Sequence, residues 1–158
     1  MCRPWHPRWH LATLRLGGMA DLGELTRRFV EDVWNGAREE TAYELVDPDC
    51  GNLGGGSGPD SALAFHRERR MSFPDQRYEI MDMVVGADSV AVRWRATGTQ
   101  LGAFGPVTPT GQQVDYEGAT FMRFAAGRIV ANWSVNELAK VLQQLGVELV
   151  PPTPQVSR

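Results

Sequence analysis

Glu137 is the side chain that the sequence places best for proton transfer. It lies where a predicted strand, residues 129–134, passes into a predicted helix. Glu137 stands one helical turn before Val141, so it borders the apolar face of that helix. A carboxylate at the edge of an apolar surface can have its pKa tuned for acid–base chemistry. The alternative is that Glu137 completes a capping box with Ser134 and begins the helix.

Four further side chains are candidates for contact with a ligand. Trp94 and Trp133 lie in predicted strands and suit a flat polycyclic ligand, although large aromatic residues also fill ordinary cores. His66, in a predicted helix, is a candidate proton-transfer partner, and a surface or supporting histidine is the alternative. Tyr116 either offers a phenol to a pocket or simply packs.

The sequence offers no pattern for a metal or a nucleotide. Of its three histidines, His6 and His10 lie close to the start of the chain. No cluster of His, Cys and carboxylate residues has the spacing of a zinc site. The run Gly54-Gly55-Gly56 lacks the following Lys-Ser/Thr and the βαβ context of a phosphate-binding loop. We therefore expect a mechanism that needs no cofactor and no metal.

Composition narrows the class of protein. The chain has 158 residues, of which 42% are hydrophobic and 22% charged, as in an ordinary globular domain. A net charge of −3 gives no electrostatic case for binding nucleic acid. No apolar run approaches the ~20 residues that cross a membrane. The two cysteines form no disulfide framework, which fits a reducing cytoplasm, so we expect a cytoplasmic protein.

The order of the predicted elements indicates an α+β fold. Apolar spacing predicts helices at residues 22–33, 39–46 and 60–72, strands at 77–84, 89–99, 114–124 and 129–134, and a closing helix that ends at Gly146. The Gly-rich segment 50–58 and the Pro/Gly segment 102–111 are predicted loops. Because the helices come first and the strands later, the pattern favours α+β over a parallel βαβ sheet.

Three ranges divide the chain. Residues 1–18 show no sustained period and no secretory core, and we expect a disordered or misread extension with the natural start at Met19. Residues 19–147 are predicted to form a single domain. Residues 148–158 carry three prolines and are predicted to be a flexible tail.

The run FMRFAAGRIVANWSVNELAKVLQQLG resembles the end of SnoaL-like polyketide cyclases and related ester cyclases, which have the nuclear-transport-factor-2-like fold. The shared pieces are the F-R-F…G-R-I hairpin, Trp133, an acidic residue four positions later and the closing Q-Q-L-G. RFVEDVWNG, ELVDPDCGN and SFPDQRYEI also resemble the family. The resemblance covers about residues 22–146.

This resemblance implies a cone-shaped α+β barrel: a curved antiparallel sheet around a pocket, packed by N-terminal helices and a C-terminal helix. It implies a small cofactor-independent cyclase that closes a ring by an aldol reaction on a hydrophobic or polycyclic substrate, working as a homodimer or larger homo-oligomer. Glu137 matches the family's Asp acid/base, and Asn52 matches a pocket position, with a turn residue as the alternative. The His that often follows that Asn is Leu53 here.

Other functions remain open on the same scaffold. One is a cofactor-free hydroxylase. Another is an epoxide hydrolase, whose Asp-Arg-Asp constellation Asp82, Arg93 and Asp115 could supply by type, although their spacing matches no defensible motif. A third is a small-molecule-binding module without catalysis.

Overall fold

The structure is a computed structural model that describes residues 21–53 and 55–148, without the side chains of Asn52 and Leu53. The predicted extension, the start at Met19 and all but the first residue of the predicted tail lie outside the described residues. The elements in chain order are α1 (Leu22–Phe29), the π-helical turn η1 (Val30–Asn35), α2 (Glu39–Leu45), β1 (Val46–Leu53), β2 (Gly56–Ser57), α3 (Gly58–Ser72), β3 (Arg77–Val85), β4 (Ser89–Thr99), β5 (Gln113–Ala125), β6 (Arg128–Asn136) and α4 (Leu138–Gln144).

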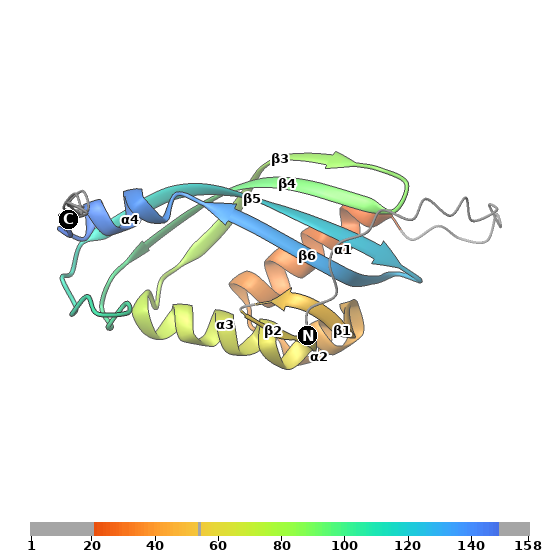
Figure 1. Cartoon of the computed structure of the whole chain (residues 1–158), viewed down its shortest axis with the longest axis horizontal. Helices are drawn as coiled ribbons and strands as arrows, with labels where there is room; N and C mark the ends of the chain where they lie inside the picture. Colours follow the sequence, from red (N-terminus) through yellow and green to blue (C-terminus); the bar gives the residue numbers. More distant parts are fainter. Residues whose placement is uncertain (1–20, 54, 149–158) are drawn as a thin grey trace, which may run out of the picture.

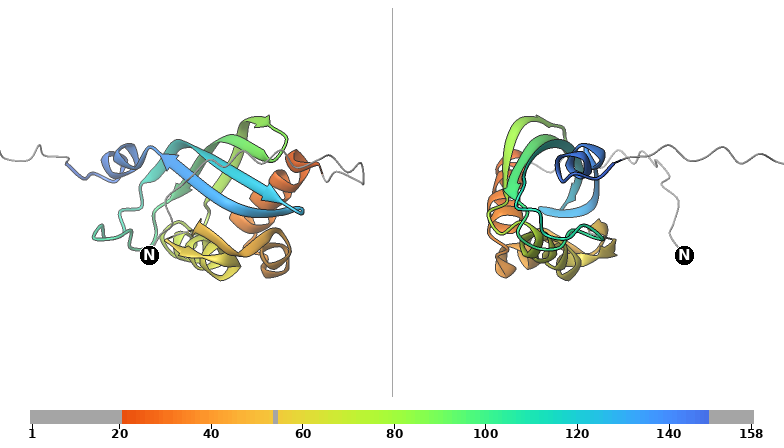
Figure 2. Two further views of the ribbon diagram at one scale, coloured as in Figure 1. Left: turned by 45° about the vertical axis from the view of Figure 1, so that its right-hand side comes forward. Right: turned by 90° about the vertical axis from the view of Figure 1, so that its left-hand side faces the viewer.

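The strands form one six-stranded sheet in the order β2-β1-β6-β5-β4-β3. It curves over the helices without closing on itself (Figure 2, right). The strands β3 to β6 pair antiparallel, which confirms the predicted α+β fold. β1 differs, because it pairs parallel to β6.

The prediction of a loop at residues 50–58 is wrong over most of its length. Val46 lies opposite Ile129 and Gly51 opposite Ala131, so β1 runs along β6 despite its Pro and Gly. Cys50 is fully buried. Pairing with a neighbouring strand and burial of the segment therefore outweigh its weak local strand propensity.

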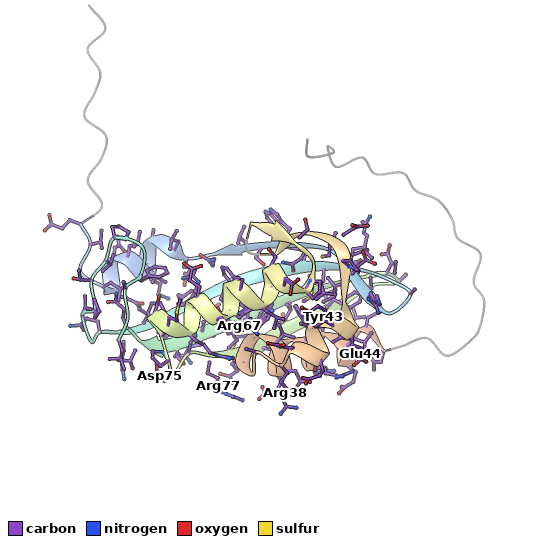
Figure 3. All side chains as sticks on the ribbon, turned by 90° about the horizontal axis from the view of Figure 1, so that it is seen from below. Arg38, Tyr43, Glu44, Arg67, Asp75 and Arg77 are labelled. Atoms are coloured by element: carbon purple, nitrogen blue, oxygen red, sulfur yellow. The ribbon has the colours of Figure 1, made fainter. Side chains whose placement is uncertain are left out.

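The helices α1, α2 and α3 cover one face of the sheet, which we call the inner face (Figure 1). Asp21 caps α1, since its Oδ1 accepts hydrogen bonds from the backbone N–H groups of Gly23 and Glu24. Ion pairs then join the helices to one another. Glu44 of α2 pairs with Arg28 of α1 at 2.6 Å. Seen from below, Glu44 lies at the surface of this helical layer, away from the sheet (Figure 3).

The core fills the space between the helices and the inner face. The alternation predicted for β4 is confirmed: Val90, Val92, Trp94 and Ala96 are buried. The opposite, outer face of the sheet carries polar residues and several exposed apolar ones. None of the described helices is long and apolar enough to cross a membrane.

The junction between β6 and α4 differs from the predicted capping box. β6 continues to Asn136, and α4 begins at Leu138. The Ser134 hydroxyl hydrogen-bonds the Thr120 hydroxyl at 2.8 Å instead of capping the helix. The cause is the ladder to β5, which extends as far as the pair Gly118–Asn136. The predicted stop at Gly146 is confirmed, with a φ of 82°.

Candidate functional site

A small cavity lies between the helical layer and the inner face of the sheet. Its volume is about 70 Å³. η1 and α3 supply one wall, and one residue or more from each of β3, β4, β5 and β6 supplies the other. The residues with functional groups at this cavity are Trp34, His66, Arg69, Tyr78, Trp94, Tyr116, Asn132 and Asn136.

Aromatic rings make up most of the cavity wall. The Trp34 ring stacks on His66 with 5.9 Å between ring centroids, and it meets Tyr78 edge-on at 5.3 Å. The π-helical turn η1 brings Trp34 to this place, and such turns are frequent at functional sites. Asn35 then fixes the turn to β3. Its Nδ2 donates to the Tyr78 carbonyl at 3.0 Å, and its Oδ1 accepts from the Tyr78 N–H at 2.8 Å.

Trp94 is held from two sides. Its Nε1 donates to the Thr120 hydroxyl at 2.9 Å. On the other side the ring lies against Gly118, where a Cβ atom would stand 2.3 Å from the ring atom Cζ2. Only a glycine therefore leaves room for the indole in this position.

His66 is a buried titratable group in the wall of this cavity. Its side chain belongs to a residue only 7% exposed, and its Nδ1 has no hydrogen-bond partner among the described residues. Burial, with a smaller effect of the positive charges of Arg70 and Arg69, lowers the pKa of His66 to about 3. The imidazole is therefore neutral at pH 7.

Further polar groups from Tyr78, Tyr116 and Asn132 line the cavity. Burial raises the pKa of Tyr78, so its phenol keeps its proton. The Tyr116 hydroxyl accepts a hydrogen bond from Gln76 Nε2 at 2.9 Å. The buried Oδ1 of Asn132 has no partner among the described residues. The one charged group that lines the cavity within the described ranges is Arg69, whose guanidinium lies 4.7 Å from the Phe104 ring centroid.

Glu137 lies outside this cavity. Its side chain is 47% exposed and pairs with Lys140 at 3.0 Å. Glu137 Oε2 also accepts a hydrogen bond from the Glu117 backbone N–H at 2.9 Å. This hydrogen bond, followed by the one from Lys140, lowers the pKa of Glu137, which favours a carboxylate over a proton donor. The predicted catalytic role of Glu137 stays a prediction, but the apolar surroundings expected for it are not found here.

A bulge in β6 decides which residues face inward. Arg123 lies opposite Ala131, and Phe124 opposite Ile129, so Val130 is an extra residue on β6. One extra residue moves every later side chain to the other face. Plain alternation from the buried Ile129 would point Trp133 inward, whereas the bulge directs Asn132 there instead.

Trp133 consequently lies on the outer face. It is 54% exposed and packs against Phe121 with 5.5 Å between ring centroids. Both rings border an open hollow of about 760 Å³ on the surface. Trp133 is therefore not brought together with Trp94, Tyr116 and His66, which do share the cavity.

Asn52 and the residues considered for an epoxide hydrolase are the remaining predicted sites. The backbone of Asn52 lies in β1, but its side chain is outside what the structure describes. The acidic and basic residues considered for an epoxide hydrolase lie on strands away from the cavity, where Arg93 pairs with Glu117 at 2.8 Å and Asp115 with Arg95 at 2.5 Å. No group of three or more His, Cys, Asp or Glu residues within the described ranges is arranged to hold a metal.

Trp34, Tyr78 and Asn132 are among the cavity residues that were not predicted from the sequence. Tyr78 was detectable, because it alternates with Ile80 on a predicted strand that faces the core. Trp34 lay at the predicted end of a helix, where the π-helical turn left no recognisable signal. Asn132 was hidden by the bulge at Val130.

The structure resembles proteins of known fold. IdmH from Streptomyces antibioticus, a proposed polyketide cyclase, is 28% identical, with a TM-score of 0.70 over 81% of this chain and 100% of that one. AclR from Streptomyces galilaeus, a proposed hydroxylase, is 27% identical, with a TM-score of 0.70 over 88% of each chain. TsrD from Streptomyces laurentii, at 19% identity and a TM-score of 0.72 over 79% of this chain and 94% of that one, shows the fold alone.

No curated protein matches the sequence. The family model for the SnoaL-like polyketide cyclases matches residues 24–145. This match takes in every helix and strand from α1 to α4 apart from the first two residues of α1. The chain therefore belongs to the SnoaL-like polyketide cyclase family.

Proposed function

We propose that this protein is a cofactor-independent cyclase that closes a ring in a small polyketide-type substrate by an intramolecular aldol reaction. The observation that carries the proposal is the aromatic cavity on the inner face, with buried polar atoms that lack partners. A carbon between two carbonyls is already acidic, so such a reaction needs only a folded substrate chain and a moved proton. Family membership supports the same reaction class.

The cavity residues would divide the work between positioning and proton transfer. The rings of Trp34 and Trp94 would hold the reacting carbons close together and keep water out. Tyr78 lines the cavity and retains its proton, so we propose that its phenol donates that proton to the carbonyl oxygen that becomes the alcohol, and that the proton released by the acidic carbon restores the phenol. Glu137, the acid expected from the sequence, would reach that oxygen only after a rearrangement of the β6–α4 junction.

Two matched substitutions test this assignment. Ring closure of a synthetic poly-β-ketone ester is followed by mass spectrometry with the wild type, Tyr78→Phe and Glu137→Gln. Loss of a proton-transfer group typically costs about 10²- to 10⁴-fold in rate. We expect a loss of that size for Tyr78→Phe, with the KM little changed, and a small change for Glu137→Gln. A large loss in Glu137→Gln alone would restore the acid predicted from the sequence.

A hydroxylase is the second candidate, favoured by the similarity to AclR, a proposed hydroxylase. Oxygen consumption in the presence of an aromatic substrate would distinguish it from a cyclase. A binding module without catalysis is the third candidate, and binding without turnover would identify it. A polyketide synthase encoded beside this gene would favour the cyclase and a role in secondary metabolism.

We also propose that the protein forms a homodimer through the outer face of its sheet. Val84, Phe121 and Trp133 are exposed there, and β-ladder pairing places them in one row across the sheet, with Ala91 between Val84 and Phe121. A contiguous apolar strip on a surface often marks a protein interface.

A further inference from the structure

The size of the cavity limits what can enter it. Pockets that enclose a whole drug-sized ligand measure roughly 300–1,000 Å³, and an engineered cavity that holds one benzene measures about 150 Å³. The cavity beside His66 measures about 70 Å³. It therefore admits one edge of a ring or a few heavy atoms, while the rest of a larger substrate must lie in its opening.

The polar atoms that line the cavity define the group that fits. Asn132 Oδ1, from β6, is buried and without a partner among the described residues, as is His66 Nδ1, from α3. An amide oxygen can only accept a hydrogen bond, whereas a neutral imidazole nitrogen accepts or donates according to its tautomer. Buried polar atoms are nearly always paired in folded proteins. The missing partner of Asn132 must be a donor.

The charge of the site selects among donors. Within the described ranges no Asp or Glu lines the cavity, and His66 is too enclosed to take up a positive charge. An ammonium group would have no counter-ion here, and Arg69 would repel it. A neutral O–H group meets both conditions, since it donates one hydrogen bond and carries no charge.

We propose that this cavity is a hydroxyl subsite that takes the enol or phenol edge of the substrate. The O–H of the substrate donates to Asn132 Oδ1. The neighbouring oxygen of the substrate lies toward the His66 ring, which itself stacks on Trp34. This assignment rests on the proposed function and deepens it by naming the part of the substrate that enters. Asn132 and His66 are then the residues that determine specificity.

The full chain is titrated with phenol and with anisole, which has the same ring but no O–H donor. Binding is read from the ¹⁵N-detected indole signals of Trp34 and Trp94, which line the cavity. We expect saturable binding of phenol, and anisole at least tenfold weaker. Equal affinity for the two compounds would overturn the proposal.

Two substitutions on the same strand give a matched comparison. Asn132→Leu keeps the side-chain size but removes the acceptor, whereas Asn136→Leu makes the same change at a residue that also lines the cavity but is exposed. We expect Asn132→Leu to weaken phenol binding at least tenfold, to leave anisole unchanged, and to keep or raise the Tm. The affinity of Asn136→Leu for phenol should stay within twofold of the wild-type affinity. Unchanged phenol affinity in Asn132→Leu would contradict the subsite.

The subsite and the proposed function can fail separately. Selective phenol binding without ring closure of the poly-β-ketone ester overturns the cyclase and leaves the subsite. Ring closure without selectivity for phenol over anisole overturns the subsite and leaves the cyclase. If Asn132→Leu does not fold, the wild-type comparison of phenol with anisole still decides the question.

Discussion

Gly118 shows how one residue sets the geometry of the cavity. A Cβ at this position would stand 2.3 Å from Trp94 Cζ2 and 2.6 Å from the Val135 carbonyl oxygen, which is backbone and cannot swing away. We expect Gly118→Ala to lower the free energy of unfolding by about 1–3 kcal/mol through overpacking. Urea unfolding measures the loss, and the indole signal of Trp94 should shift. Gly51→Ala is the control, because its Cβ would meet nothing within 4 Å; equal losses in both variants would contradict this account.

His66 should make the stability of the protein depend on pH. Its pKa falls from 6.5 to about 3 on folding, chiefly through burial, so the unfolded chain binds the proton more readily. The contribution is therefore fully present above pH 6.5 and is lost as the pH falls from 6.5 toward 3. Between pH 6.5 and 5 we expect a loss of about 1.5 kcal/mol in the free energy of unfolding.

Urea unfolding of the wild type and of His66→Gln at these two pH values checks the prediction. His66→Gln should show little of this slope, since glutamine does not titrate. The charged groups that act on His66 are Arg69 and Arg70. An equal slope in the two proteins would mean that His66 is not the group responsible.

At the scale of the elements, one side chain of α4 is hydrogen-bonded to the backbone of β5. Gln144 Oε1 accepts from the Asp115 N–H, and Gln144 Nε2 donates to the Asp115 carbonyl, both at 3.0 Å. Gln144→Ala removes both bonds, and we expect faster hydrogen exchange in α4 and a loss of about 1–2 kcal/mol. Gln143→Ala, on the exposed side of the same helix, is the control. Similar exchange in both variants would show that Val141 and Leu145 hold the helix alone.

The elements also show what the sequence could and could not predict. Apolar spacing found α1, α2, α3 and the strands β3 to β6, and the alternation of buried and exposed residues is clearest in β4 and β5. It misplaced the start of α4, since Ser134 and Glu137 form a capping pattern that the ladder to β5 overrides. The bulge at Val130 has no local signature, so the directions of Asn132, Trp133 and Glu137 could not be derived from alternation. The set of side chains that face the cavity from β6 therefore depends on the bulge at Val130, which only the pairing of β6 with β5 reveals.

At the scale of the molecule, the two faces of the sheet have different tasks. The inner face and the helices enclose the cavity, and the outer face presents Val84, Phe121 and Trp133 at 68%, 48% and 54% exposure. These residues lie in one row through the register pairs Val84–Ala91, Ala91–Phe121 and Phe121–Trp133. Two charged groups beside the row are paired within the chain, Arg93 with Glu117 and Arg123 with Asp88. A second copy that covers the row can therefore leave these two ion pairs intact.

A charge placed in this row should separate the two copies. Trp133→Glu puts a carboxylate at the β6 end of the row, where burial in an interface would leave it unpaired, so we expect the variant to sediment as a monomer while the wild type sediments as a dimer. Met71→Glu is the control, since Met71 is 71% exposed but lies on α3, on the helical side. Because Trp133 lies outside the cavity, phenol binding should persist in the monomer. Dissociation by Met71→Glu instead would place the interface on the helices, and a monomeric wild type would remove it altogether.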